Sequence, residues 1–248
     1  MNALVVILFC IVGGSVAFPY NMCERESERC YELSSRGQLR GMNYLPTVEQ
    51  LRVMCPKFVQ YIDCEKDLVK TCTGKSIEEV MTSSNRSLAE YASQVSGYDS
   101  LTADICNENS ALHRDYAPSV ECVRNVVQSG PPYECGDAGR EAVKAYLNST
   151  KYDQNEEDGP TKKCLRISYS IACFVNRLVK SCGESAERAL VTTLQKLRPL
   201  ADSEYACTAE IGLVLRGAFF ESLTFDTEEK KRLFQSVFEM LAGGILNV

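Results

Sequence analysis

Apolar residues recur with the period of an α-helix along most of the chain. Residues 164–182 carry one such stripe, made of Ile167, Ile171, Phe174, Val175 and Leu178. Residues 55–72 carry another, made of Phe58, Val59, Ile62 and Val69. Polar residues fill the positions between them, and the every-second-residue alternation of a half-buried strand is scarce. The sequence therefore predicts an all-α fold.

Local signals mark where several of these helices begin. Residues 47–50 and 76–79 each have the form of a capping box, in which Thr or Ser precedes Gln or Glu by three positions. The second box opens an apolar stripe that extends to Val95. Pro56 and Pro118 suit the first position of a helix, where a missing N–H costs nothing. These signals predict helix starts at four places in the first half of the chain.

The amino-terminal residues have the character of a secretory signal peptide. Residues 1–17, MNALVVILFCIVGGSVA, join an apolar run to the small-x-small ending Ser15-Val16-Ala17. A membrane anchor is the alternative, but the run from Ala3 to Ile11 is shorter than the roughly 20 residues that a bilayer needs. Arg216 and Glu221 interrupt the apolar stretch beginning at Ile211, so no transmembrane segment is expected. The mature chain is predicted to be secreted and extracellular.

Removal of Cys10 with the signal peptide leaves an even number of cysteines, because the whole chain has 13. In the oxidising secretory route this predicts six disulfides. The cysteines concerned are Cys23, Cys30, Cys55, Cys64, Cys72, Cys106, Cys122, Cys135, Cys164, Cys173, Cys182 and Cys207. Zinc is the competing explanation, but no C-x2-C pair occurs and His113 is the only histidine. Neither a metal nor another cofactor is expected.

The cysteine spacing repeats within the chain. The segment DLVKTC ends at Cys72 and RLVKSC ends at Cys182, and each belongs to a triplet of similarly spaced cysteines. The flanking cysteines correspond in the same order, although their spacing is looser. The pattern predicts a tandem duplication: a helical cysteine-rich repeat over 18–118, a second over 119–207, and a C-terminal helical segment over 208–248.

The helical projection places cysteines on two faces of one helix in each repeat. Cys164 and Cys182 fall on the apolar face of their helix and Cys173 nearly opposite; Cys55 and Cys64 divide in the same way. We expect disulfides to clamp each helix on both faces, which requires that neither Cys64 nor Cys173 is a free thiol. Which cysteine pairs with which cannot be read from their order.

Two N-x-S/T sequons and the net charge bear on the surface. Asn85 and Asn148 are candidate glycosylation sites in a secreted chain. The formal net charge of −6 gives no reason to expect nucleic acid or an anionic membrane as a partner.

The chain resembles a family of secreted, cysteine-rich, helical arthropod proteins of unknown function, similar to insect haemolymph glycoproteins and to secreted proteins of spiders and ticks. The features that carry the resemblance are LPTVEQLRVMC, the two cysteine triplets and KSCGESAERAL, and they cover about residues 23 to 207. The resemblance implies an extracellular glycoprotein without an assigned reaction.

Candidates for catalysis are few. A nucleophile needs a base, and the only histidine, His113, lies among polar residues, which predicts a solvated side chain at a helix end. The chain has 33 acidic residues and no Trp, and nothing in the sequence singles out a carboxylate pair. Residues 156–158 lack the spacing of a calcium loop and are expected to be an exposed loop. No catalytic residue is predicted, and the chain is expected not to be an enzyme.

The remaining functions involve binding. We expect an extracellular binding or structural protein; the alternative is a carrier of a hydrophobic small molecule or lipid, whose amphipathic stripes would line a cavity instead of plain core. A last helix is expected from about Asp226, in a segment rich in Phe. It either docks onto the repeats or presents an exposed face to another extracellular protein. The structure can distinguish these hypotheses. A carrier should have an internal void, and an interaction module should have an exposed apolar patch. An enzyme should have a cleft that holds His113 or several carboxylates.

Overall fold

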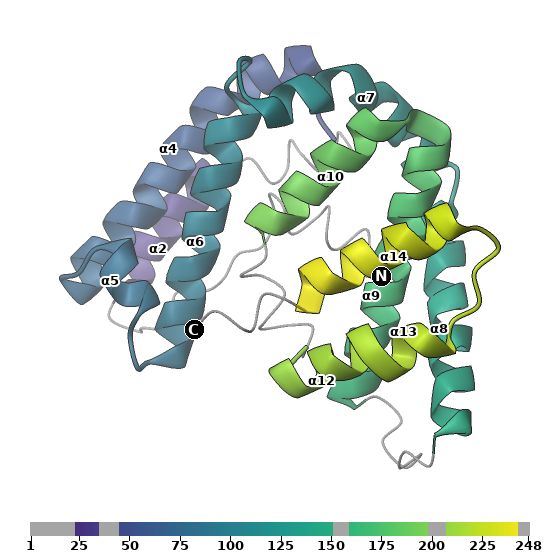
Figure 1. Ribbon diagram of the computed structural model, residues 1–248. Helices are drawn as coiled ribbons and strands as arrows, with labels where there is room; N and C mark the ends of the chain where they lie inside the picture. The colour runs from purple at the N-terminus through teal and green to yellow at the C-terminus, as the bar shows by residue number, and fades with distance from the viewer. Residues whose placement is uncertain (1–22, 35–44, 151–158, 198–206, 243–248) are drawn as a thin grey trace. The chain divides into compact units, whose positions relative to one another are not determined.

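The computed structural model describes residues 23–34, 45–150, 159–197 and 207–242 (Figure 1). These residues form helices and the turns between them, and no strand occurs in the described part of the chain. The all-α prediction is therefore confirmed. The predicted signal peptide and residues 156–158 lie outside the described residues. None of the described helices combines the length and apolarity needed to cross a bilayer.

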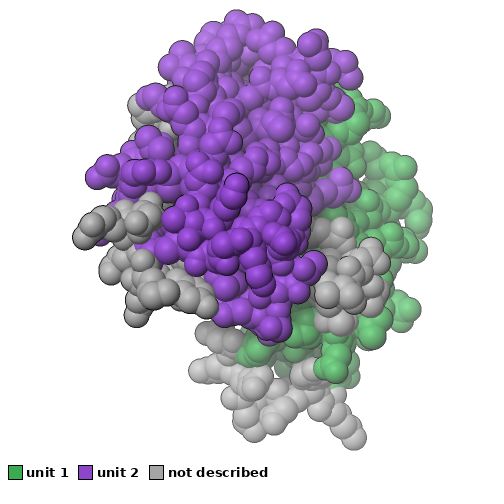
Figure 2. Space-filling model, turned by 90° about the vertical axis from the view of Figure 1, so that its left-hand side faces the viewer, with its two compact units in different colours: residues 1–7, 122–191, 201–248 green, residues 8–121, 192–200 purple. Residues whose placement is uncertain are grey.

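The chain divides into two compact units (Figure 2). Their boundary falls between residues 121 and 122, and the described residues 192–197 belong with the earlier part of the chain. We call the unit that contains residues 23–121 the N-terminal unit, and the unit that contains residues 122–191 and 207–242 the C-terminal unit. The predicted repeat boundaries, 18–118, 119–207 and 208–248, stay predictions.

The N-terminal unit contains α2 (Glu24–Leu33), α4 (Val48–Thr73), α5 (Ile77–Met81), α6 (Arg86–Ile105) and the first part of α7 (Ala111–Gln128). Both predicted capping boxes are present. The Thr47 hydroxyl accepts from the Gln50 amide at 3.3 Å while the Gln50 side chain accepts from the Thr47 amide at 2.8 Å. Ser76 and Glu79 make the same reciprocal pair at the start of α5. Helix α4 packs against α2 and α6, burying Leu68 and Val69.

Three sequence-based expectations for this part of the chain are wrong. Pro56 and Pro118 do not open helices but lie inside α4 and α7. An internal proline costs about 3 kcal/mol, and packing on both sides offsets it, since Met54 and Phe58 flank Pro56 in the core. The third wrong expectation is Val59, which was predicted to belong to the buried apolar stripe but is 45% exposed.

The C-terminal unit contains the rest of α7, α8 (Pro131–Ser149), α9 (Pro160–Cys182) and most of α10 (Glu184–Lys196). Beyond these lie α12 (Ala209–Val214), the π-helical turn η3 (Leu215–Phe219), α13 (Phe220–Ser222) and α14 (Glu228–Ala242). The predicted stripe of α9 is buried as expected: Ile167, Ile171, Phe174, Val175 and Leu178 are each at most 4% exposed. Helices α8 and α9 run antiparallel, because Cys135 is joined to Cys173 while Gly139 faces Arg166 and Ser170.

The carboxyl-terminal segment docks onto α9 (Figure 1). Its phenylalanines form a connected aromatic cluster that also includes one tyrosine from each of α8 and α9. Phe234 meets Tyr169 edge-on at 5.3 Å, and Phe219 meets Tyr146 at the same distance. Phe219, Phe234 and Phe238 are at most 1% exposed. Of the two alternatives for this segment, docking is the one found.

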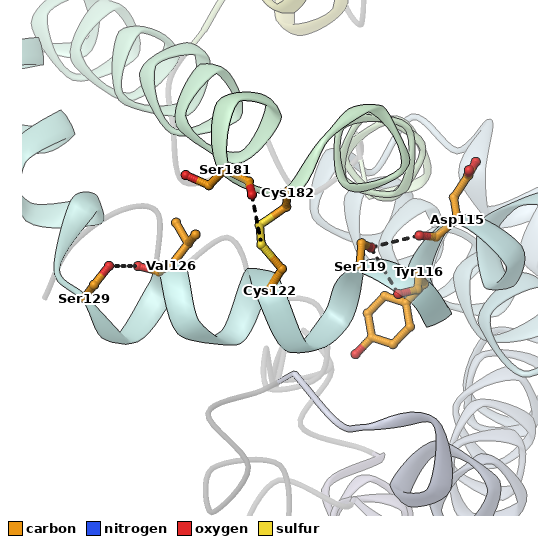
Figure 3. Close-up of a disulfide and its surroundings, with 8 residues drawn as sticks. All are labelled: Asp115, Tyr116, Ser119, Cys122, Val126, Ser129, Ser181 and Cys182. Atoms are coloured by element: carbon orange, nitrogen blue, oxygen red, sulfur yellow. Dashed lines mark hydrogen bonds between the residues drawn. A yellow bond between two sulfur atoms is a disulfide. The ribbon is translucent and has the colours of Figure 1, made fainter.

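The six disulfides use all twelve predicted cysteines. In the N-terminal unit the bonds are Cys23–Cys72, Cys30–Cys64 and Cys55–Cys106. In the C-terminal unit they are Cys122–Cys182, shown in Figure 3, Cys135–Cys173 and Cys164–Cys207. Cys64 and Cys173 are both in disulfides, as required by the prediction that disulfides hold each helix on both faces.

The order of pairing is the same in both units: first with fifth, second with fourth, and third with sixth. In each unit three bonds tether one long helix, α4 or α9, near its start, its middle and its end. A tandem duplication would leave this arrangement, and the duplication itself stays a prediction.

Candidate binding cleft

An open cleft of about 480 Å³ lies in the C-terminal unit. One wall is a face of α8, and the other is formed by residues 222–225 with Lys230 of α14; Tyr169 of α9 also lines it. Small-molecule sites in proteins commonly have volumes of about 300–1,000 Å³. The cleft therefore has the size of a ligand site.

The α8 wall is a stripe of mostly small side chains. The residues that line the cleft from this helix are Ala138, Glu141, Ala142, Ala145, Tyr146 and Ser149. They recur at three- and four-residue spacing, which keeps them on one helical face. Because three of the six are alanines, the groove stays open where larger side chains would fill it.

The opposite wall is held in place by the turn that ends α13. The Leu223 amide donates to the Phe220 carbonyl at 3.2 Å, and the Ser222 hydroxyl donates to the Phe219 carbonyl at 2.7 Å. Phe225 then packs against Phe220 at 5.4 Å and Phe234 at 5.3 Å between ring centroids. Residues 223–225 are thereby fixed opposite α8 by the same aromatic cluster that docks α14.

In the described part of the chain, two charged residues line the cleft, Glu141 and Lys230. The Lys230 ammonium lies 3.0 Å from the Asp226 carboxylate. This hydrogen bond holds the pKa of the Asp226 carboxyl below its ordinary value. The positive charge of Lys230 is thus largely offset by Asp226.

Glu141 differs from the other acidic residues of α8. Glu134 is paired with Arg177 at 2.5 Å, and Asp137 is paired with Arg140. Among the described residues Glu141 has no ion-pair partner within 4.0 Å. Its carboxylate therefore sets the sign of the charge at the cleft.

His113 lies in the N-terminal unit, outside the cleft. The sequence predicted a solvated side chain, and this prediction is wrong. Its side chain is only 6% exposed, and its Nδ1 lies 2.6 Å from the Ile105 carbonyl oxygen. Ser110 donates its hydroxyl to the Asp104 carbonyl at 2.6 Å and accepts from the His113 amide at 2.9 Å. Both side chains bond carbonyls of the last turn of α6, which a helix leaves without intrahelical partners. The ring is buried because it closes that helix end.

A second polar cluster lies between α4 and α6. The Tyr91 hydroxyl donates to the buried Glu65 carboxylate, with Gln94 nearby. Burial above all, and then the charge of Glu65, raises the pKa of the Tyr91 hydroxyl. The adjoining void is about 10 Å³, which is room for one water molecule at most. This cluster joins two helices and has no space for a ligand.

The two sequon asparagines are on the surface. Asn85 is the N-cap of α6, and its side-chain oxygen accepts from the Leu88 amide at 3.2 Å. Asn148 is exposed in the last turn of α8, next to Ser149 of the cleft. Exposure is what a glycosylation site requires, and modification at both residues stays a prediction.

In the part of the chain that the structure describes, no group of three or more His, Cys, Asp or Glu side chains is placed to hold a metal ion. Comparison of the chain with family models, curated proteins and solved structures gives no match. The cleft could not be predicted from the sequence, because one of its walls comes from a segment that only tertiary docking brings to α8. The spacing of Ala138, Ala142 and Ala145 was the one available signal.

Proposed function

We propose that this protein is a secreted, disulfide-braced glycoprotein that binds a small ligand in the α8 cleft without catalysing a reaction. The observation that carries the proposal is the cleft of about 480 Å³, built on the tightly packed α8–α9 pair. The Cys135–Cys173 bond holds the pair together. A rigid, preformed site binds with a smaller ordering cost than a mobile one.

The composition of the cleft supports binding over catalysis. Among the described residues its lining contains neither histidine nor cysteine, and Glu141 is the only carboxylate. General acid–base and nucleophilic mechanisms need a base paired with a second group. Apolar walls with a few polar groups are instead typical of recognition sites.

Carriage of a hydrophobic small molecule or lipid is the second candidate. Tyr146, Tyr169, Leu223 and Phe225 supply the apolar surface that favours it. The cleft is open at the surface, which suits a ligand of modest size better than a fully enclosed lipid. We therefore place binding of a compact ligand first.

The experiment uses tryptophol, a neutral indole alcohol, as the probe. Because the chain contains no Trp, excitation at the red edge of the indole band reports the probe alone. We expect its fluorescence anisotropy to rise on titration with the full secreted chain. Ala142→Phe, which fills the cleft, should abolish the rise. Ala103→Phe, at an exposed position of α6, is the matched control and should leave it intact. An equal rise with Ala142→Phe, or absence of a rise with tryptophol and with its cationic and anionic indole analogues alike, would refute the cleft as a ligand site.

A further inference from the structure

The polar groups of the cleft point to the chemical class of the ligand. We propose that the cleft binds an amphipathic organic cation, a compact apolar body that carries an ammonium group; this inference rests on the cleft being a ligand site. Three features of the lining lead to it: a carboxylate without an ion pair among the described residues, the direction in which two serine hydroxyls donate, and the apolar walls.

The first feature is the charge. Among the residues that the structure describes, Glu141 is the one carboxylate on the lining, and it makes no ion pair there. Lys230, the one cation among the described lining residues, has its charge offset by Asp226 at 3.0 Å. A ligand in the cleft therefore meets a net negative charge, which favours a cation.

The second feature is the direction of the hydrogen bonds. The Ser149 hydroxyl donates to the Tyr146 carbonyl at 2.7 Å, and the Ser222 hydroxyl donates to the Phe219 carbonyl at 2.7 Å. A hydroxyl group has one proton, so each of these oxygens can offer a ligand only its lone pairs. An ammonium group carries three donors and no acceptor. The available acceptors at Ser149, Ser222 and Glu141 match that donor set.

The third feature is the apolar surface between these polar groups. The rings of Tyr169 and Phe225 line the cleft, and the alanines of α8 leave room beside them. An apolar body buried there is removed from water, and a nearby aromatic ring also attracts a cation at its face. A cation without an apolar body would lose this contribution.

The test compares three probes with the same indole ring and different charge. Tryptamine is the cation, tryptophol its neutral isostere and indole-3-acetate the anion, and each is followed by fluorescence anisotropy with the full chain. We expect tryptamine to bind about two- to fivefold more tightly than tryptophol, as an exposed ion pair allows. Indole-3-acetate should bind most weakly. The advantage of tryptamine should shrink as salt is raised, because salt screens exposed charges.

Two substitutions assign the preference to Glu141. Glu141→Gln should bring tryptamine to the affinity of tryptophol, and Glu141→Lys should reverse the order in favour of indole-3-acetate. Glu28→Gln, at an exposed glutamate of α2 in the other unit, is the control and should change nothing. Equal affinities for the three probes, or a preference for the anion in the unaltered chain, would overturn the ligand class while leaving the cleft as a binding site. Failure of all three to bind would overturn the proposed function itself.

Discussion

Gly139 of α8 and Ser170 of α9 approach so closely that a methyl group at Gly139 would lie 2.9 Å from the Ser170 hydroxyl oxygen. The Arg166 carbonyl oxygen would be 3.0 Å away. Ser170 itself donates to the Arg166 carbonyl at 2.8 Å and reaches the Cys135 carbonyl at 3.3 Å. The two backbones can meet at this point only because residue 139 has no side chain.

Gly139→Ala should therefore destabilise the C-terminal unit, although alanine is the better helix former. We expect a loss of about 1–3 kcal/mol in the free energy of unfolding, because the helices must separate. Gly136→Ala, one turn earlier with nothing within 4 Å, is the matched control. It should gain up to about 1 kcal/mol from helix propensity. Urea unfolding followed by circular dichroism measures both, and equal effects would contradict the close-packing argument.

The His113 ring should contribute stability without contributing chemistry. Since Nδ1 faces a carbonyl oxygen, it must carry a proton and donate. His113→Ala removes a buried hydrogen bond and leaves a cavity, so we expect a loss of about 2–4 kcal/mol. His113→Asn retains a donor near the Nδ1 position and should lose clearly less. If His113→Ala unfolds at the same urea concentration as the unaltered chain, this account of the helix junction is wrong.

Tyr91 predicts how stability changes in alkaline solution. Its pKa is raised above the ordinary 10.0 in the folded protein, so the unfolded chain loses this proton first as pH rises. The contribution of the protonated Tyr91 hydroxyl to the free energy of unfolding is fully present below about pH 10 and declines as the pH rises above that value. We expect the unfolding free energy to fall above pH 10, and Tyr91→Phe to flatten that fall. Tyr133→Phe, at a side chain 64% exposed, should leave the slope unchanged.

Asn85 combines two roles that substitution can separate. Asn85→Ala removes both the sequon and the cap of α6, and loss of the cap should cost about 1 kcal/mol. Ser87→Ala removes the sequon alone, because the side-chain oxygen of Asn85 still accepts from Leu88. Both variants of the secreted chain should lose one glycan by intact mass, and only Asn85→Ala should lose stability after enzymatic deglycosylation. A mass of Ser87→Ala that is lower by only the one oxygen atom of the substitution would show that Asn85 carries no glycan.

The sequence was informative where the cause of a structure is local. The capping boxes at Thr47 and Ser76 depend on residues three positions apart, and both were predicted correctly. The α9 stripe was also correct, because a strongly apolar face has few alternatives. The prediction that Pro56 opens a helix was wrong, because the preference of proline for helix starts takes no account of packing. The buried side chains of Met54 and Phe58 keep α4 continuous across Pro56.

The features missed by sequence reasoning are those created by contacts between distant segments. His113 is flanked by polar residues, and only the meeting of α6 and α7 buries its ring. The cleft depends on residues 222–225 being held opposite α8, more than 70 residues from Ser149 in the chain. Disulfide pairing is of the same kind, since cysteine order permits many connectivities and the fold selects one.

The pairing order has a consequence for how the protein is made. Cys23 can form its native bond only after Cys72 has been synthesised, and Cys55 only after Cys106. Cys30 and Cys64 are both synthesised before either of these partners. No native bond joins two cysteines that are consecutive along the chain. Oxidation of the first thiols to emerge from the ribosome would therefore trap wrong bonds, which thiol–disulfide exchange must then undo. The yield of correctly folded chains should depend on disulfide isomerase capacity more than on the strength of the oxidant.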